Sequence, residues 1–132
     1  MADARFITAE NAVVEQLHWG SFDWLSRPGL TAAEQLLLVR VHIPPGRGHA
    51  FHRHPEYEEI IYVLEGQAEQ WVEQERQLLS PGDSAHIPTN VVHATYNSSD
   101  RGLTVLAILS PAKISGPAQI DVSGEEPWRS LR

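Results

Sequence analysis

Residues 46–66 read GRGHAFHRHPEYEEIIYVLEG, and their histidines and carboxylates are the most informative feature of the chain. In an extended chain, residues i and i+2 point to the same side. His52 and His54 can therefore present two imidazoles next to each other. Pro55 then allows the chain to turn, and Glu59 opens the apolar segment that follows.

Glu59 is the carboxylate that we expect beside these histidines. In the strand predicted for residues 59–64, Ile61 shares its face, and apolar residues also occupy the other face. A charged group among apolar residues needs a partner, and a cation held by two histidines supplies one. The neighbouring Glu58 competes for this role, but strand alternation places it on the opposite face, in solvent or paired with Arg53.

A third imidazole comes from residues 88–97, which read PTNVVHATYN, because His93 opens a predicted strand just after a turn. Three neutral imidazoles and one carboxylate suit Fe, Mn, Ni, Zn, Cu or Co, and are a poor match for Ca or Mg. We therefore predict one divalent metal ion per chain. Its identity stays open, and an octahedral ion would keep two positions free for water, dioxygen or a substrate. The predicted ligands are His52, His54, Glu59 and His93.

The rest of the chain predicts a small all-β domain. Short apolar segments alternate with turns that contain Gly, Pro, Asn and Asp, which is typical of a sandwich or barrel. No βαβ alternation indicates a parallel α/β sheet. The predicted strands are residues 36–43, 59–64, 68–72, 76–79, 85–87, 92–96 and 103–109.

Three parts are expected along the chain. Residues 1–34 are predicted to be an irregular lead-in that packs on the barrel or on a dimer partner, and within it residues 9–17 fit a short helix or a strand equally well. Residues 35–110 form the barrel. Residues 111–132 are expected to be a tail on the outside of the barrel or on a partner subunit.

Both histidine segments resemble the two sequence motifs of the cupin superfamily. The likeness extends over residues 35–110, and the chain resembles small, single-domain bacterial cupins. It implies a single double-stranded β-helix, or jelly-roll barrel, and a metal site, without specifying the reaction. The first motif is matched by Gly46, His52, His54, Glu59 and Gly66, and the second by Gly82, Pro88, His93 and Asn97.

One position departs from the second motif. Asn90 stands where the family usually has glycine. Asparagine tolerates left-handed backbone angles better than most residues, so the turn is expected to survive.

Composition excludes several classes of site. The 132 residues include no cysteine, which rules out disulfides, thiolate nucleophiles and cysteine-bound metals. The net charge of −7 argues against a nucleic-acid partner. No signal-like or membrane-spanning apolar run is present, so we expect a cytoplasmic protein without a membrane partner. Open barrels expose sheet edges that must be covered, and we therefore expect a homodimer.

Other candidate residues carry weaker signals. His86 could line the cavity as a proton-transfer group, although a hydrogen-bonded histidine on the barrel wall is the favoured interpretation. Tyr96 is the second acid/base candidate, and Tyr57 could line a pocket for an aromatic or sugar-like ligand. His49 lies in the loop before the ligand pair and is expected to be exposed. Burial in a core or a dimer contact is the favoured interpretation for Trp19, Trp24 and Trp71.

These features predict a metalloenzyme that acts on a small organic molecule. Dioxygenase-type chemistry is the first candidate, and an isomerase, lyase or decarboxylase is also compatible with the ligands. The alternative is a non-catalytic cupin that binds a small molecule or a metal as a sensor or carrier.

Overall fold

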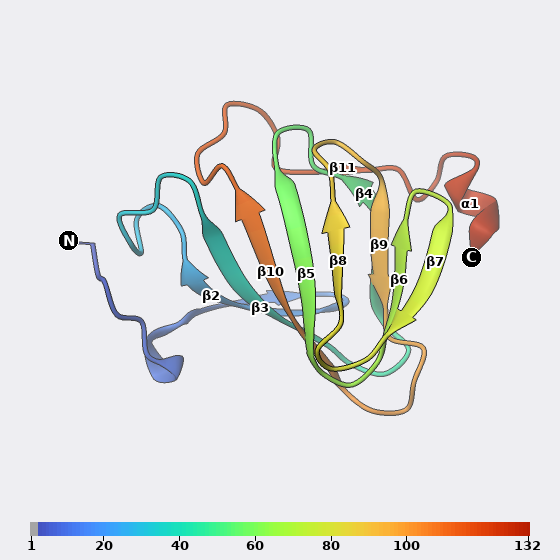
Figure 1. The fold of residues 1–132 in the computed structure, drawn as a ribbon, viewed down its shortest axis with the longest axis horizontal. Helices are drawn as coiled ribbons and strands as arrows, with labels where there is room; N and C mark the ends of the chain where they lie inside the picture. Colours follow the sequence, from blue (N-terminus) through green and yellow to red (C-terminus); the bar gives the residue numbers. More distant parts are fainter. Residues whose placement is uncertain (1–2) are drawn as a thin grey trace.

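The computed structural model describes residues 3–132 and consists mainly of β-strands (Figure 1). They form two antiparallel sheets, ordered β1-β2-β3-β10-β5-β8 and β11-β4-β9-β6-β7. This arrangement confirms the predicted all-β barrel. The elements are η1 (Ala9–Asn11), β1 (Val13–Leu17), β2 (Gly20–Ser26), β3 (Leu37–Ile43), β4 (Gly48–Arg53), β5 (Glu58–Glu65), β6 (Ala68–Val72), β7 (Glu75–Leu79), β8 (Ser84–Ile87), β9 (His93–Tyr96), β10 (Leu103–Ser110), β11 (Ile120–Asp121) and α1 (Trp128–Leu131).

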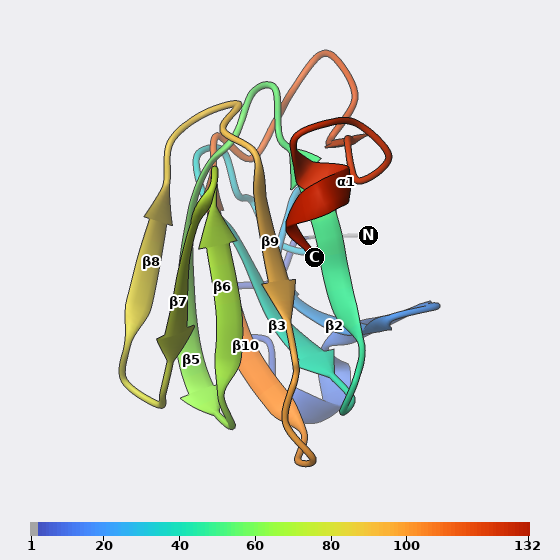
Figure 2. The same ribbon diagram turned by 90° about the vertical axis from the view of Figure 1, so that its right-hand side faces the viewer.

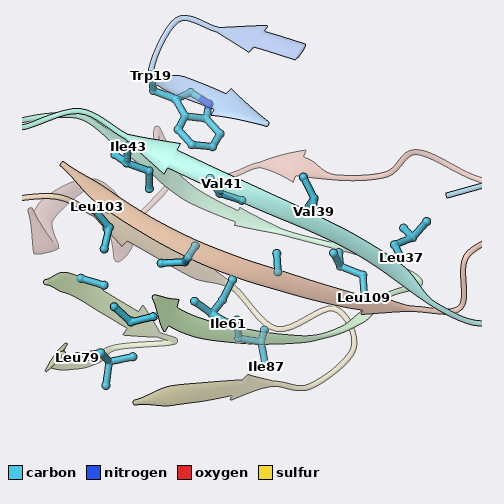
Figure 3. Close-up of a cluster of buried hydrophobic side chains, with 14 of the residues drawn as sticks. Trp19, Leu37, Val39, Val41, Ile43, Ile61, Leu79, Ile87, Leu103 and Leu109 are labelled. Carbon is cyan, nitrogen blue, oxygen red and sulfur yellow. The ribbon is translucent and has the colours of Figure 1, made fainter. Parts of the chain in front are cut away.

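The main hydrophobic core lies on the inner face of the six-stranded sheet (Figure 3). On β5, Ile61 and Val63 are buried, whereas Ile60 and Tyr62, which alternate with them along the strand, are exposed. This is the alternation that the sequence predicted for the strand. The neighbouring strands β3 and β10 add a continuous set of aliphatic side chains, namely Leu37, Val39, Val41, Ile43, Leu103, Val105 and Leu109.

The lead-in is more regular than the sequence indicated. Strand β1 pairs with β2, and β2 pairs with β3, so residues 13–26 extend the six-stranded sheet. The residues of β1 are largely exposed and those of β2 are half-buried throughout. A hairpin without a buried face has no strong alternation of apolar and polar residues, which is why its strands were hard to predict.

The tail extends the edge of the five-stranded sheet and places α1 beside it (Figure 2). Strand β11 pairs with β4, with Ile120 opposite Arg53. Helix α1, which the sequence did not predict, places Trp128 and Leu131 against a second cluster that includes Phe51 of β4. The tail therefore packs on its own barrel. The expected homodimer stays a prediction. Within the described range, no helix has the length and apolar character of a membrane span.

A buried carboxylate of this sheet binds the end of the tail through hydrogen bonds. Glu69 of β6 accepts hydrogen bonds from Trp71 Nε1 at 2.8 Å and from Arg132 Nε at 2.8 Å. The Arg132 guanidinium also lies 3.8 Å from the centre of the Tyr96 ring. Burial raises the pKa of Glu69, but Arg132 and Trp71 outweigh it and bring that pKa from 4.5 to about 2.

The lowered pKa of Glu69 predicts that the folded protein loses stability in acid. Because the pKa of Glu69 is lower in the folded chain, its contribution is present above about pH 4.5 and is lost as the pH falls towards 2. We expect Glu69→Gln to lower the free energy of unfolding by about 1–2 kcal/mol at pH 7 and by much less at pH 3. Urea denaturation at both pH values measures this. Glu75→Gln, on the exposed strand β7, is the control, and an equal loss for Glu69→Gln at both pH values would contradict the assignment.

Candidate metal centre

Three histidines meet between the two sheets. His52 on β4 lies opposite His93 on β9 in the strand register, and His54 follows the end of β4. One ring nitrogen from each histidine lies within 4.8 Å of the others, and all three residues are buried. The structure therefore brings together the three imidazoles that the sequence predicted as ligands.

The backbone fixes which ring nitrogen faces the centre. The Nδ1 atoms of His52, His54 and His93 lie 2.6, 2.9 and 2.9 Å from the carbonyl oxygens of residues 50, 118 and 91. A carbonyl oxygen only accepts, so each Nδ1 must carry the hydrogen, and in a neutral ring Nε2 then keeps its lone pair. This is the usual arrangement of metal-binding histidines, whose second nitrogen donates to a carbonyl or carboxylate.

Glu59 completes the cluster from β5. Its Oε1 lies 3.0 Å from Nε2 of His93 and 3.3 Å from Nε2 of His54. The same oxygen is fully buried and has no well-oriented hydrogen-bond donor. Burial raises the pKa of Glu59, but His54 and His93 outweigh it and bring that pKa to about 2. A charged carboxylate in this buried site thus needs a cation between its oxygen and the Nε2 atoms, either a proton on an imidazole or a metal ion.

This donor set fits a metal ion. Four acceptors that converge without a donor repel one another unless a cation lies between them. Burial, together with the other histidines, lowers the pKa of His52 well below its usual value, which keeps that ring neutral and suited to ligation. The pKa of His54 is raised, because Glu59 outweighs the effect of burial. A proton on His54 is therefore the competitor that a metal ion would displace.

His49 also faces this site, contrary to the expectation that it would be exposed. Its ring stacks on His52 at 3.6 Å between centres and on Trp19 at 4.4 Å. Gln119 Nε2 lies 3.2 Å from its Nε2. Burial lowers the pKa of His49 to about 3, so the ring is neutral at pH 7. The strand register shifts between His49 and His52, and this bulge turns both side chains inward.

The two acid/base candidates lie away from the centre. His86 is exposed on the outer face of β8, where its Nε2 lies 2.6 Å from Glu58 Oε2. The suggestion that it lines the cavity is wrong, and the barrel-wall interpretation holds. Glu58 is indeed on the opposite face from Glu59, but its partner is His86, because Arg53 donates to Asn90 instead.

Tyr96 points outward as well. Along β9, His93 and Thr95 face the cavity, whereas Tyr96 packs against Phe51 in the second cluster with a ring separation of 6.0 Å. It is therefore not placed to exchange protons with a ligand of the metal. Asn90 adopts a left-handed backbone with φ of 66°, which confirms that asparagine can replace the glycine of the motif.

The cluster lines a cavity of about 410 Å³ between the sheets. Tyr57 lines it, as proposed, with its ring 5.7 Å from that of His54. Trp19 and Trp24 line it too, so core or dimer burial was an incomplete interpretation for them. Trp71 is buried in the second cluster, as favoured. Trp19 and Trp24 both come from the β1–β2 hairpin, which was not predicted from the sequence.

Known proteins share this architecture. The pectin degradation protein KdgF of Dickeya dadantii is 29% identical over 91 residues, which cover 69% of this chain and 82% of that protein. The solved structure of KdgF from a Halomonas species has a TM-score of 0.73 at 22% identity and covers 83% and 96% of the two chains. A structure of Bacillus subtilis oxalate decarboxylase, a protein with Mn(II) centres, has a TM-score of 0.73 at 18% identity, over 87% of this chain and 31% of that one.

The family model of the cupin domain matches residues 39–109, more than half of the chain. This range contains all four converging side chains and most strands of the two sheets. With the fold of its structural relatives and a three-histidine group that could bind a metal, the chain belongs to the cupin family.

Proposed function

We propose that this protein is a metal-dependent enzyme acting on a small organic molecule, with dioxygenase-type chemistry as the first candidate. The observation that carries the proposal is the convergence of three imidazole Nε2 atoms and the Glu59 carboxylate in the lining of a cavity. A storage or purely structural barrel has no need for four buried acceptors that face one another.

In this proposal His52, His54, Glu59 and His93 hold one divalent transition metal. Bound there, the ion would supply a Lewis acid with open positions for substrate oxygens or dioxygen. The Mn(II) centres of a structurally similar oxalate decarboxylase support metal binding in this fold. The chain's own contribution is to orient the ligands through three backbone carbonyls and to exclude water with apolar walls.

An isomerase, lyase or decarboxylase is the second candidate. Such a reaction needs a proton donor or acceptor near the substrate. His86 and Tyr96 do not reach the cavity, but His49 and Tyr57 line it and could serve. The similarity to a pectin degradation protein and to an oxalate decarboxylase supports this class of reaction as the second candidate.

Oxygen consumption distinguishes these candidates. The protein is loaded with Fe(II) and offered a panel of diketones, catechols and flavonoids in an oxygen electrode. We expect at least one compound to drive uptake well above that of a His93→Gln variant. A flat response across the panel would exclude dioxygenase chemistry on these substrates. Metal and ligand binding without any turnover would instead support the non-catalytic sensor or carrier.

A further inference from the structure

We infer that the ligand of this cavity is an apolar, preferably aromatic molecule with two oxygen donors at one end, and not a sugar acid or a small dicarboxylate. The inference rests on the proposed function, since the donors would face the metal ligands. It concerns the part of the cavity that lies beyond those ligands.

One wall of the cavity is a continuous row of aromatic rings. Trp24 and Phe22 meet edge to face at 5.7 Å, and Phe22 and Trp19 do so at 5.6 Å. From Trp19 the row continues through His49, stacked at 4.4 Å, to His52 at 3.6 Å. Aromatic rings therefore extend from the metal ligands to the β1–β2 hairpin and offer both faces and edges to an apolar, aromatic ligand.

Beside this row, the same sheet is aliphatic, because β2 pairs with β3 and Phe22 lies opposite Val41 in the strand register. Strand β3 contributes Val39 and Val41, and β10 contributes Val105 and Leu109, all buried in the main core and lining the cavity. Figure 3 shows Trp19 beside β3, with the side chains of Val39 and Val41 along the same strand. The volume of about 410 Å³ lies within the range of roughly 300–1,000 Å³ typical of small-molecule sites.

Charge selects against anionic ligands. None of the described residues that line the cavity is a lysine or an arginine. The nearby Arg47 donates to the carbonyl oxygen of His18 and is not part of the cavity lining. The charged side chains in the lining are Glu59 and Glu15, and Glu15 accepts a hydrogen bond from Trp24 Nε1 at 3.0 Å. A ligand carboxylate that points away from the metal ligands would have no lysine or arginine of the lining to pair with it.

Three ligands with the same spacing of two oxygens test the inference. Zn(II)-loaded protein, whose zinc content is measured first, is titrated calorimetrically with benzoylacetone, acetylacetone and malonate. We expect benzoylacetone to bind about tenfold more tightly than acetylacetone, because its phenyl group buries additional apolar surface. Malonate is expected to bind more weakly than either. Malonate binding at least as tightly as benzoylacetone, or no gain from the phenyl group, would overturn the inference.

Two Trp24 variants test whether the aromatic rings cause the tighter binding of benzoylacetone. Trp24→Ala is expected to remove most of the difference between benzoylacetone and acetylacetone, whereas Trp24→Phe should retain it. Tyr62→Ala, on the exposed face of β5, is the matched control and should change neither affinity. An unchanged difference in Trp24→Ala would overturn the inference. Absence of bound Fe(II), Mn(II) and Zn(II) alike would refute the proposed function instead, and quenching of tryptophan fluorescence by benzoylacetone in metal-free protein would then still test the apolar cavity.

Discussion

Replacing His93 with alanine is expected to lower the affinity for a divalent transition metal by at least about a hundredfold. Its ring is 2% exposed and contributes one of three converging imidazoles, and its Nδ1 is already held by the carbonyl oxygen of Val91. Removing only an outer hydrogen-bond partner of such a ligand typically costs about 10–100-fold, so losing the ligand itself should cost more. Competition titration against a chromophoric chelator measures the change.

Two further variants make this result specific. His93→Gln keeps much of the side-chain volume and shows whether the loss follows from the missing imidazole or from a cavity. His86→Ala removes a histidine that is exposed on the outer face and should leave the affinity unchanged. Equal affinities for the wild type and both His93 variants, with the fold preserved by circular dichroism, would show that His93 is not a ligand.

Metal removal should produce the second large effect, a drop in thermal stability of about 10–20 °C. A ligand that binds only the folded chain, at about a thousand times its Kd, stabilises that chain by about 4 kcal/mol. For a domain of this size each kcal/mol shifts Tm by roughly 3–5 °C. The converging acceptors make the metal-free centre unfavourable, so the folded state should depend strongly on the ion.

Differential scanning calorimetry of metal-loaded and chelator-treated protein measures this shift. Glu59→Gln should reduce it, because a neutral amide binds the cation more weakly than a carboxylate does. Glu58→Gln, which alters the adjacent residue on the opposite face of the strand, should leave the shift intact. A Tm that does not respond to the metal in the wild type would contradict a structural coupling between the centre and the fold.

The inward placement of His52, His54 and Glu59 was predictable because it depends on local strand geometry. The two-residue spacing of His52 and His54 and the alternation of β5 depend only on strand geometry. These patterns placed Glu59 inside and Glu58 outside, as the structure shows. The position of His93 followed from the second motif, whose backbone turn survives with Asn90 in a left-handed conformation.

The missed features depend on non-local pairing. His49 lies three residues before His52, so regular alternation would place the two on opposite faces, and only the bulge turns both inward. His86, in contrast, lies on the outer face, because it pairs with the exposed Ile60 on β5. A sequence pattern does not reveal which strands pair or where a register shifts.

The chain segments outside the motifs gave the weakest predictions, although they contribute to the site. Trp19 and Trp24 come from the hairpin at the start of the chain, and the carbonyl oxygen that orients His54 belongs to Ala118 in the tail. No residue of the hairpin strands β1 and β2 is fully buried, and the tail packs through a few side chains such as Trp128. Neither segment carries a periodic signal that could reveal its position.

Elemental analysis tests the central claim most directly. The purified chain is stripped with a chelator, dialysed in turn against Fe(II), Mn(II) and Zn(II), freed of excess metal and measured by mass spectrometry, beside a His52→Ala/His54→Ala double variant. The account predicts about one equivalent of at least one of these metals per wild-type chain and almost none in the double variant. No stoichiometric metal in the folded wild type, or equal amounts in both proteins, would contradict it.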